Sequence, residues 1–285
     1  MPLNQLTDSE FKQLRDYIEK SCGIALGDEK AYLVQNRLTG LLAEAGCASF
    51  DELYRKATAD PTLGLRDKIV DAMTTNETSW FRDSYPFDIL QRMILKKFAD
   101  EIVAGKRRHI RIWCAACSTG QEPYGVGIVL QEFSRRIQVL PLARTEIVAT
   151  DISPSVLFLA AAGRFDTIAM SRGMPSDIRD RYFTCSGRTW IMHDTIRKMV
   201  TFKKLNLQDD FSRLGHFDVV FCRNVMIYFS DSFKRHLFSR LSSVLNPGAY
   251  LFLGASESAG NYTDKFTSIN ENKHMYFQFG GETHP

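Results

Sequence analysis

The stretch that decides the fold is HIRIWCAACSTGQEPYGVGIVLQEFSRR, residues 109–136. Residues 109–114 are a compact apolar run that predicts a strand, and residues 121–136 predict a helix. The loop between them, 115–120, consists mostly of small residues. A strand that leads through a short loop into a helix is the repeating unit of a parallel sheet covered by helices.

The same alternation continues along the chain. We expect strands at 146–150, 217–222 and 249–254, the last after a turn at Asn246-Pro247-Gly248, and helices from Ser153-Pro154 and over about 231–245. Proline is favoured in the first turn of a helix, which supports the start at Ser153-Pro154. Residues 273–278 are expected to form an antiparallel edge strand. The predicted fold class is α/β, with a mainly parallel sheet covered on both faces.

Two regions depart from this alternation. Residues 6–75 show helical patterns only, with N-cap chemistry at Thr7-Asp8-Ser9-Glu10 and further helices expected from Asp28 to about Ala45, from near Ser49 and from near Thr62. Short runs at 188–192 and 199–202 predict small strands of a compact antiparallel insertion at about 172–204. We therefore predict a helical domain over 1–75, a linker over 76–90 that contributes to the functional site, and an α/β domain over 91–285.

The composition excludes several classes of protein. Of the 285 residues, 44% are hydrophobic and 24% charged, and the net charge of +3 gives no electrostatic case for nucleic acid. The basic excess within 172–204 fits either an acidic partner or a solvated face. The chain contains no run of about 18 apolar residues, so no membrane span is predicted. The N-terminus lacks the order of a signal peptide, in which basic residues precede an apolar run. We expect a cytoplasmic monomer with reduced cysteines.

Metal and redox chemistry are not expected. Cys114 and Cys117 have the spacing of a zinc or redox pair, but no second pair or His partner follows at ligand spacing. The first of the two also belongs to a predicted strand. We expect both to be buried, inert thiols, and we predict no metal site.

Ligands of open parallel sheets bind beyond the carboxyl ends of the strands. The small residues after the first strand allow close approach of a ligand, although they do not form the Gly-x-Gly-x-x-Gly pattern of dinucleotide sites. Asp151, after the second strand, is either a ribose ligand or a helix cap, and we expect an exposed carboxylate whose loss leaves the fold intact. Arg223 and Asn224 directly follow a predicted strand. Residues 74–83 mix polar and aromatic side chains, as in a lid or binding loop.

Together these segments resemble the CheR family of chemotaxis receptor methyltransferases. The resemblance rests on TNETSWFR at 75–82, AACSTGQEPY at 115–124, ATDI at 149–152, FDVVFCRNVMIYF at 217–229, NPG at 246–248 and GASES at 254–258. The matches keep the family order and span roughly residues 6–279, and the run 222–229 is highly specific.

The resemblance implies a Rossmann-like S-adenosylmethionine methyltransferase sheet with a helical N-terminal domain and a small antiparallel β insertion. It implies S-adenosylmethionine as cofactor, S-adenosylhomocysteine as product, and glutamate methyl esters on methyl-accepting chemotaxis receptors, formed during sensory adaptation. The implied cofactor-binding residues are Asn76, Thr78, Arg82, Glu122, Asp151, Asn206, Leu207, Arg223 and Asn224, and the residues nearest the transferred methyl are Arg82 and Tyr228.

The chemistry explains why no general base is needed. A sulfonium methyl is already electrophilic, and a glutamate carboxylate is ionised near neutral pH. Alignment of the reacting atoms remains the main task. Alternatives are a methyltransferase of the same fold that acts on small molecules or RNA, and a non-enzymatic module that senses S-adenosylmethionine.

Some family members dock through the β insertion onto a peptide at the receptor C-terminus. Those members carry an extra glycine-containing loop in the insertion, whereas this chain has only Ser186-Gly187 as an obvious turn there. We expect docking without such a tether. The basic residues Arg188, Arg197, Lys198, Lys203 and Lys204 and the Lys30–Arg37 helix would instead meet acidic receptor helices directly.

Overall fold

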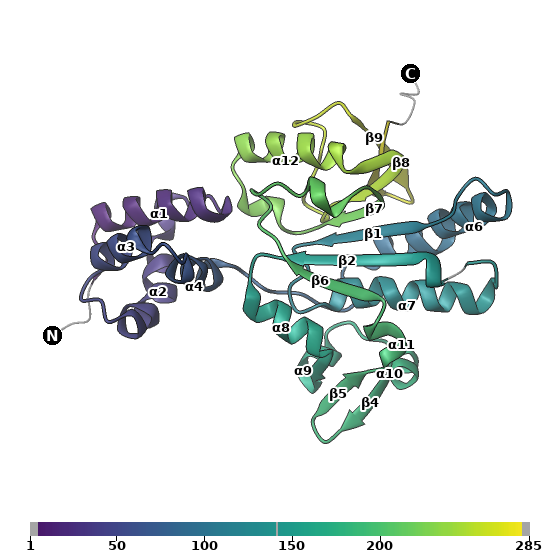
Figure 1. Cartoon of the computed structure of the whole chain (residues 1–285), viewed down its shortest axis with the longest axis horizontal. Coiled ribbons are helices and arrows are strands. Elements are labelled where there is room, and N and C mark those ends of the chain that lie inside the picture. Colours follow the sequence, from purple (N-terminus) through teal and green to yellow (C-terminus); the bar gives the residue numbers. More distant parts are fainter. Residues whose placement is uncertain (1–4, 141, 281–285) are drawn as a thin grey trace.

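The computed structural model describes residues 5–140 and 142–280 (Figure 1). Residues 1–4 and 281–285, at the outer ends of the predicted domains, lie outside this range. Most of the N-terminal segment that was judged not to be a signal peptide lies outside it too. A helical bundle stands at one end, a helix-covered sheet forms the centre, and a small sheet projects beside it. No helix in the described part of the chain is long and apolar enough to cross a membrane.

The helical bundle confirms the helices predicted before residue 76. It contains α1 (Asp8–Cys22), the 3-10 turn η1 (Asp28–Lys30), α2 (Ala31–Ala45), α3 (Phe50–Ala59) and α4 (Gly64–Met73). Thr7 and Glu10 form a capping box at α1, and the Ser49 hydroxyl accepts from the Glu52 amide at α3. Gly46 ends α2 in the left-handed conformation that glycine adopts without strain.

The central sheet has seven strands in the order β6-β2-β1-β7-β8-β10-β9. The strands are β1 (Ile110–Ala115), β2 (Thr145–Asp151), β6 (Val200–Lys204), β7 (Phe217–Cys222), β8 (Leu245–Phe252), β9 (Phe266–Glu271) and β10 (His274–Phe279). The first five are parallel, and β10 pairs antiparallel with both β8 and β9. The α/β fold class is confirmed.

Three details of the sheet prediction are wrong. Strand β10 is not the edge, because the unpredicted β9 lies outside it. Residues 246–248 do not form a separate turn: they lie within β8, where the register with β7 shifts between Phe217 and Val219. The run at 199–202 belongs to β6, which pairs with β2 in the main sheet.

Alternating side chains of the strands face two helical layers. Ile112 and Cys114 pack in the cluster that contains α5 (Tyr85–Ile89), the π-helical turn η2 (Leu90–Ile94), α6 (Leu95–Val103) and α7 (Gln121–Arg136). Trp113 and Ala115 pack in the opposite cluster, with α12 (Asp231–Ser243). This period of two is what a sheet buried on both faces requires.

The small antiparallel sheet is built from β3 (Arg164–Asp166), β5 (Thr189–Met192) and β4 (Phe183–Ser186), in that order. Its third strand thus comes from before residue 172, where the insertion was predicted to begin. The helices α9 (Thr167–Ser171) and α10 (Ser176–Tyr182) pack against it, whereas α8 (Pro154–Ala162) packs on β6 and β2 of the main sheet and α11 (Asp194–Arg197) on α7. The 3-10 turns η3 (Leu142–Arg144), η4 (Ser212–Leu214) and η5 (Met226–Tyr228) complete the elements.

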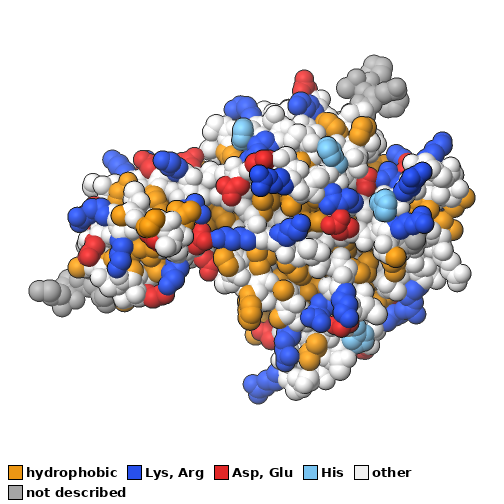
Figure 2. Space-filling view, viewed as in Figure 1, with side chains coloured by type: hydrophobic (Ala, Val, Ile, Leu, Met, Phe, Trp, Pro, Cys, Tyr) orange, Lys and Arg blue, Asp and Glu red, His pale blue; other side chains and the backbone are white. Residues whose placement is uncertain are grey.

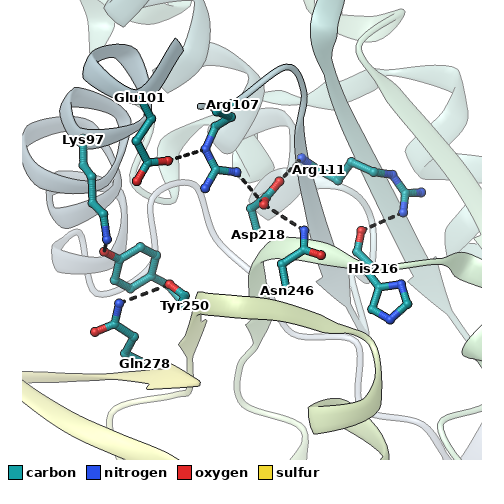
Figure 3. Close-up of polar contacts among 10 residues, drawn as sticks. Lys97, Glu101, Arg107, Arg111, His216, Asp218, Asn246, Tyr250 and Gln278 are labelled. Carbon is teal, nitrogen blue, oxygen red and sulfur yellow. Dashed lines mark hydrogen bonds and ion pairs between the residues drawn. The ribbon is translucent and has the colours of Figure 1, made fainter. Parts of the chain in front are cut away.

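A buried carboxylate ties the amino ends of three strands to α6 (Figure 3). Asp218 accepts hydrogen bonds from the Arg107 guanidinium at 2.5 Å, the Arg111 amide at 2.8 Å and the Asn246 side chain at 2.9 Å. Arg107 also pairs with Glu101 at 2.7 Å. The network gives the Asn246 side chain a structural role, as a donor to Asp218, whereas the sequence placed Asn246 only in an expected turn.

We predict that Asp218→Ala lowers the free energy of unfolding by about 2–3 kcal/mol, because it leaves a half-buried guanidinium and a backbone amide without their acceptor. Urea unfolding measures the change. The matched control is Glu146→Ala, which breaks the half-exposed Arg111–Glu146 pair and should cost less than about 1 kcal/mol. Equal losses in the two variants would show that Asp218 is no more than a surface charge.

Candidate active site

A cavity opens beyond the carboxyl ends of the parallel strands. It encloses about 990 Å³ of empty space, part of it open to solvent, and is lined by segments 74–79, 116–118, 205–207, 223–225 and 228–229 together with Cys22, Ile24, Arg82, Phe87, Glu122, Asp151 and Ile152. All ten predicted site residues line this one cavity: Asn76, Thr78, Arg82, Glu122, Asp151, Asn206, Leu207, Arg223, Asn224 and Tyr228. Their roles toward a ligand remain predictions.

Arg223 joins three of the lining segments. Its side chain is only 2% exposed and lies 2.8 Å from Glu122 and 2.8 Å from Asp83. The same guanidinium donates to the Arg82 carbonyl at 2.7 Å. Burial alone would lower the pKa of Arg223, but the two carboxylates raise it overall, so the guanidinium stays charged. Arg223 thereby fixes the linker against the start of α7.

Glu122 sits in the first turn of α7 and faces the cavity. Burial raises the pKa of its carboxyl group, and the neighbouring Arg223 opposes this shift. Because Arg223 donates to only one of the two carboxylate oxygens, the other oxygen remains available for a positively charged or hydrogen-bonding part of a ligand.

Asp151 is buried, so the expectation of an exposed carboxylate is wrong. Only 6% of the residue is exposed. Its oxygens accept from the Ser118 amide at 2.8 Å and the Ser153 amide at 3.0 Å. Burial raises the pKa of Asp151, and these amides oppose the shift. Asp151 therefore organises the loop after β1 as well as lining the cavity.

The backbone around the cavity is strained. Six of the nine described non-glycine residues with positive φ lie in three segments at the site: Phe81, Asp83, Ser84, Ala116, Ser118 and Asn224. Each such residue costs free energy that its surroundings must offset, and such residues cluster at functional sites. This concentration marks the cavity independently of its side chains.

The linker is held in place by a buried anchor. Trp80 is 1% exposed and makes edge contacts with Phe165 and Phe183 of the small sheet. A side chain at Gly173 would place Cβ 2.3 Å from the Trp80 carbonyl oxygen, so only glycine fits there. The anchor fixes the neighbouring Arg82, whose guanidinium makes one long contact, 3.5 Å to the Glu77 carbonyl, among the described residues.

The helical bundle also forms part of the wall, which the sequence did not reveal. Cys22 and Ile24 line the cavity. Ile24 forms a β-bridge with Phe229, and the Ala25 amide donates to the Tyr228 carbonyl at 2.8 Å. Neither residue belongs to a pattern that predicts a site, because their positions depend on how the bundle docks.

Docking of the bundle uses several residues that were predicted to have other partners. The Asn206 side chain donates to the Ser21 carbonyl at 2.8 Å. Lys204 pairs with Asp67 of α4. Arg37, by contrast, is engaged within the bundle itself, where it donates to the carbonyls of Met73 and Thr74 at 2.7 and 2.9 Å. Lys204 and Arg37 are thus engaged within the chain.

The cysteines near the cavity are buried free thiols. Cys114, Cys117 and Cys222 are buried, and burial raises the pKa of each thiol well above its ordinary value. Burial likewise raises the pKa of Cys22 to about 11. Thiols that stay protonated are poor nucleophiles and poor metal ligands. In residues 5–140 and 142–280, no group of three or more His, Cys, Asp or Glu is placed to hold a metal ion.

The sheet has a cleft at its carboxyl edge, a strand-end acid at Asp151 and a small-residue loop before α7. This is the arrangement of Rossmann-like nucleotide-binding domains, the class to which S-adenosylmethionine-dependent methyltransferases belong. Residues 76–275 match the family described as CheR methyltransferase, SAM binding domain, and residues 9–74 match CheR methyltransferase, all-alpha domain. The chain belongs to the CheR methyltransferase family.

Similar proteins agree with this assignment. The chain is 45% identical over 263 residues to chemotaxis protein methyltransferase 1 of Pseudomonas aeruginosa, covering 92% of this chain and 94% of that one. It is 42% identical to chemotaxis protein methyltransferase Cher2 of Pseudomonas putida, covering 94% and 97%. It is 41% identical to a chemotaxis protein methyltransferase of Vibrio parahaemolyticus, covering 96% of this chain and 98% of that one.

The cavity fits S-adenosylmethionine. Its lining combines polar and apolar side chains, as sites for small molecules and cofactors do. Asp151 and Glu122 offer acceptors for hydroxyl and ammonium groups, and Ile24, Leu207 and Phe229 give it apolar wall. The buried Arg223 Nε has no hydrogen-bond partner among the described residues, and its guanidinium could be completed by a carboxylate or a water.

We predict that Asp151→Ala lowers both stability and affinity for S-adenosylhomocysteine. Losing the acceptor of two backbone amides should cost about 1–3 kcal/mol of unfolding free energy, and losing the predicted hydrogen bonds to ribose about 1.5–3 kcal/mol of binding. Thermal unfolding and calorimetry measure the two effects. The control Asp166→Ala removes the side-chain cap of α9 and should change stability alone. If Asp151→Ala bound with wild-type affinity, Asp151 would be only a loop-forming residue.

Proposed function

We propose that the protein transfers the methyl group of S-adenosylmethionine to glutamate carboxylates of methyl-accepting chemotaxis receptors, forming glutamate methyl esters. The observation that carries the proposal is the charge arrangement at the cavity. Asp83 and Glu122 both pair with Arg223, whereas the Arg82 guanidinium is in no ion pair among the described residues and makes only a long contact, 3.5 Å to the Glu77 carbonyl. A free guanidinium beside a methyl-donor site suits a carboxylate substrate.

The bound sulfonium supplies an electrophilic methyl group. The residues of this chain then need only to hold the receptor carboxylate in line with it, which removes much of the entropic barrier. In the proposal, Arg82 orients the incoming carboxylate. The Tyr228 hydroxyl, which makes no hydrogen bond within the described part of the chain, adds a weaker donor. A weaker donor positions the oxygen without strongly stabilising its ground-state charge.

The remaining lining residues divide by chemistry. We assign Asp151 to the ribose hydroxyls and Glu122 to the amino-acid portion of the cofactor. Arg223 and Asn224 close the site near the methionine end. Asn76 and Thr78 approach from the linker, and Asn206 and Leu207 flank the adenine. The Asn206 side-chain nitrogen donates to the Ser21 carbonyl and its oxygen accepts from the Gln208 amide at 3.0 Å, so we assign its contact with adenine to packing.

We propose that docking needs no C-terminal receptor tether. Support comes from the short β4–β5 connection, a two-residue turn at Gly187-Arg188 that directly follows Ser186. The electrostatic part of the expectation is weaker than the sequence suggested, because Arg197 and Lys198 pair with Asp194 of the same helical turn. On the face shown in Figure 2, Lys and Arg side chains are spread over all parts of the molecule and interleaved with Asp and Glu. We therefore propose weak, distributed contacts.

The decisive assay uses radiolabelled S-adenosylmethionine and membranes that contain chemoreceptors. We predict label that enters the receptor and is released by mild base, as carboxylate esters are. Receptors whose methylated glutamates are changed to alanine serve as the control. Base-stable label, or label transferred to RNA instead, would exclude glutamate esterification.

Two further arms of this assay test docking. Removing the C-terminal residues of the receptor should change the methylation rate less than about twofold, whereas raising ionic strength should slow it, because exposed charge pairs are screened beyond about 8–10 Å at physiological salt. A large loss on tail removal would refute tether independence.

We predict that Arg82→Ala and Tyr228→Phe lower turnover by about tenfold or more while changing the Kd for S-adenosylhomocysteine much less, because both groups act on the alignment of the reacting atoms. Arg92→Ala, an exposed arginine of η2, is the control and should leave both quantities unchanged. Parallel losses of binding and turnover would assign Arg82 and Tyr228 to cofactor binding instead.

A further inference from the structure

A carboxylate outside the cavity holds together the two strand ends behind it. Glu257 lies in the irregular connection that follows β8. Its Oε2 accepts from the Asn224 amide at 2.8 Å and from the Gly254 amide at 2.6 Å. Its Oε1 accepts from the Ile227 amide at 3.2 Å. One side chain thus satisfies three backbone donors, two of them just beyond the neighbouring strands β7 and β8.

The segment that these bonds hold is a wall of the active site. Residues 223–225, 228 and 229 line the cavity, whereas Glu257 does not. Asn224 has φ of 57°, a left-handed conformation that is unfavourable for residues other than glycine. The hydrogen bond to its amide helps to stabilise that conformation, which turns the chain after Arg223.

The space around the carboxylate is closely fitted. A Cβ at Gly254 would lie 2.6 Å from Asn224 Nδ2, 2.8 Å from Glu257 Oε2 and 2.9 Å from the Asn224 amide nitrogen. Only glycine permits this approach, so the two strand ends meet with the carboxylate between them. GASES at 254–258 supplies both the glycine and the glutamate.

We propose that Glu257 is a positioning residue of the methyltransferase site: by accepting the amides of Asn224, Ile227 and Gly254, it sets the conformation of 223–228 and thereby the places of Arg223, Asn224 and Tyr228. The expected effect of Glu257 on turnover rests on the proposed function, whereas its expected effect on cofactor affinity does not depend on which substrate is methylated. The alternative is a purely structural role, in which Glu257 only stabilises its own loop, where its amide donates to the Gly254 carbonyl at 2.9 Å.

The geometry predicts different outcomes for two substitutions. Glu257→Gln can place its oxygen at the Oε2 position, keep the two short bonds and lose only the long one to Ile227. Glu257→Ala loses all three. We expect Glu257→Ala to raise the Kd for S-adenosylhomocysteine about tenfold to a hundredfold, the range for residues that orient the groups of a site, and Glu257→Gln to stay within about threefold.

Calorimetry on the full chain gives the Kd, and thermal unfolding checks the fold. Asp264→Ala, an exposed carboxylate in the same connection, is the matched control and should behave as wild type. If Glu257→Ala does not fold, Glu257→Asp replaces it, because the shorter side chain cannot reach both strand ends. The Kd should then rise as expected for alanine.

Wild-type affinity in Glu257→Ala, or in Glu257→Asp, would overturn the proposal. So would equal damage in Glu257→Gln and Glu257→Ala, because charge rather than hydrogen-bond geometry would then be at work. The Kd is measured without a receptor. A wrong receptor substrate would therefore appear only in the transfer assay, and a wrong role for Glu257 would appear in the Kd.

Discussion

The site depends on one buried cation. Arg223 follows β7, is almost inaccessible to solvent, and lies between Glu122 of α7 and Asp83 of the linker. A buried ion pair is costly to form and more costly to break, because removal of one partner leaves an uncompensated charge. The triad therefore couples three segments that are far apart in the sequence. It leaves the guanidinium of Arg82 as the cationic group without a carboxylate partner among the described lining residues.

The second constraint is that the helical bundle completes the cavity. Main-chain pairing of 24–25 with 228–229 brings Cys22 and Ile24 to the wall. On the other side, Asp71 of α4 accepts from the hydroxyls of Ser153 and Ser155 at the start of α8. The bundle thus touches both the segment that carries Tyr228 and the segment that follows Asp151. A shift of the bundle would therefore move both walls of the cavity.

The sequence predicted the parts of the fold that depend on local pattern. Apolar runs identified β1, β2 and β7, and capping residues identified α1 and α3. The family resemblance, rather than local pattern, named ten residues that the structure gathers around one cavity. The prediction was wrong where the structure depends on pairing between residues far apart in the sequence. A short run such as 200–204 can belong to either sheet, and only its pairing with β2 assigns it. The burial of Asp151, the network of Asp218 and the bonds of Glu257 depend on which loops meet, which no periodicity encodes.

The central claim is that segments 74–79, 116–118, 205–207 and 223–229, together with Asp151, form one cofactor site that includes the docked helical bundle. Hydrogen–deuterium exchange with and without saturating S-adenosylhomocysteine tests it most directly, because exchange reports each segment separately. The account predicts slower exchange in all of these segments and at residues 22–25, with no change around Asp218 at the opposite end of the sheet. Protection confined to one segment, or absent from residues 22–25, would contradict it.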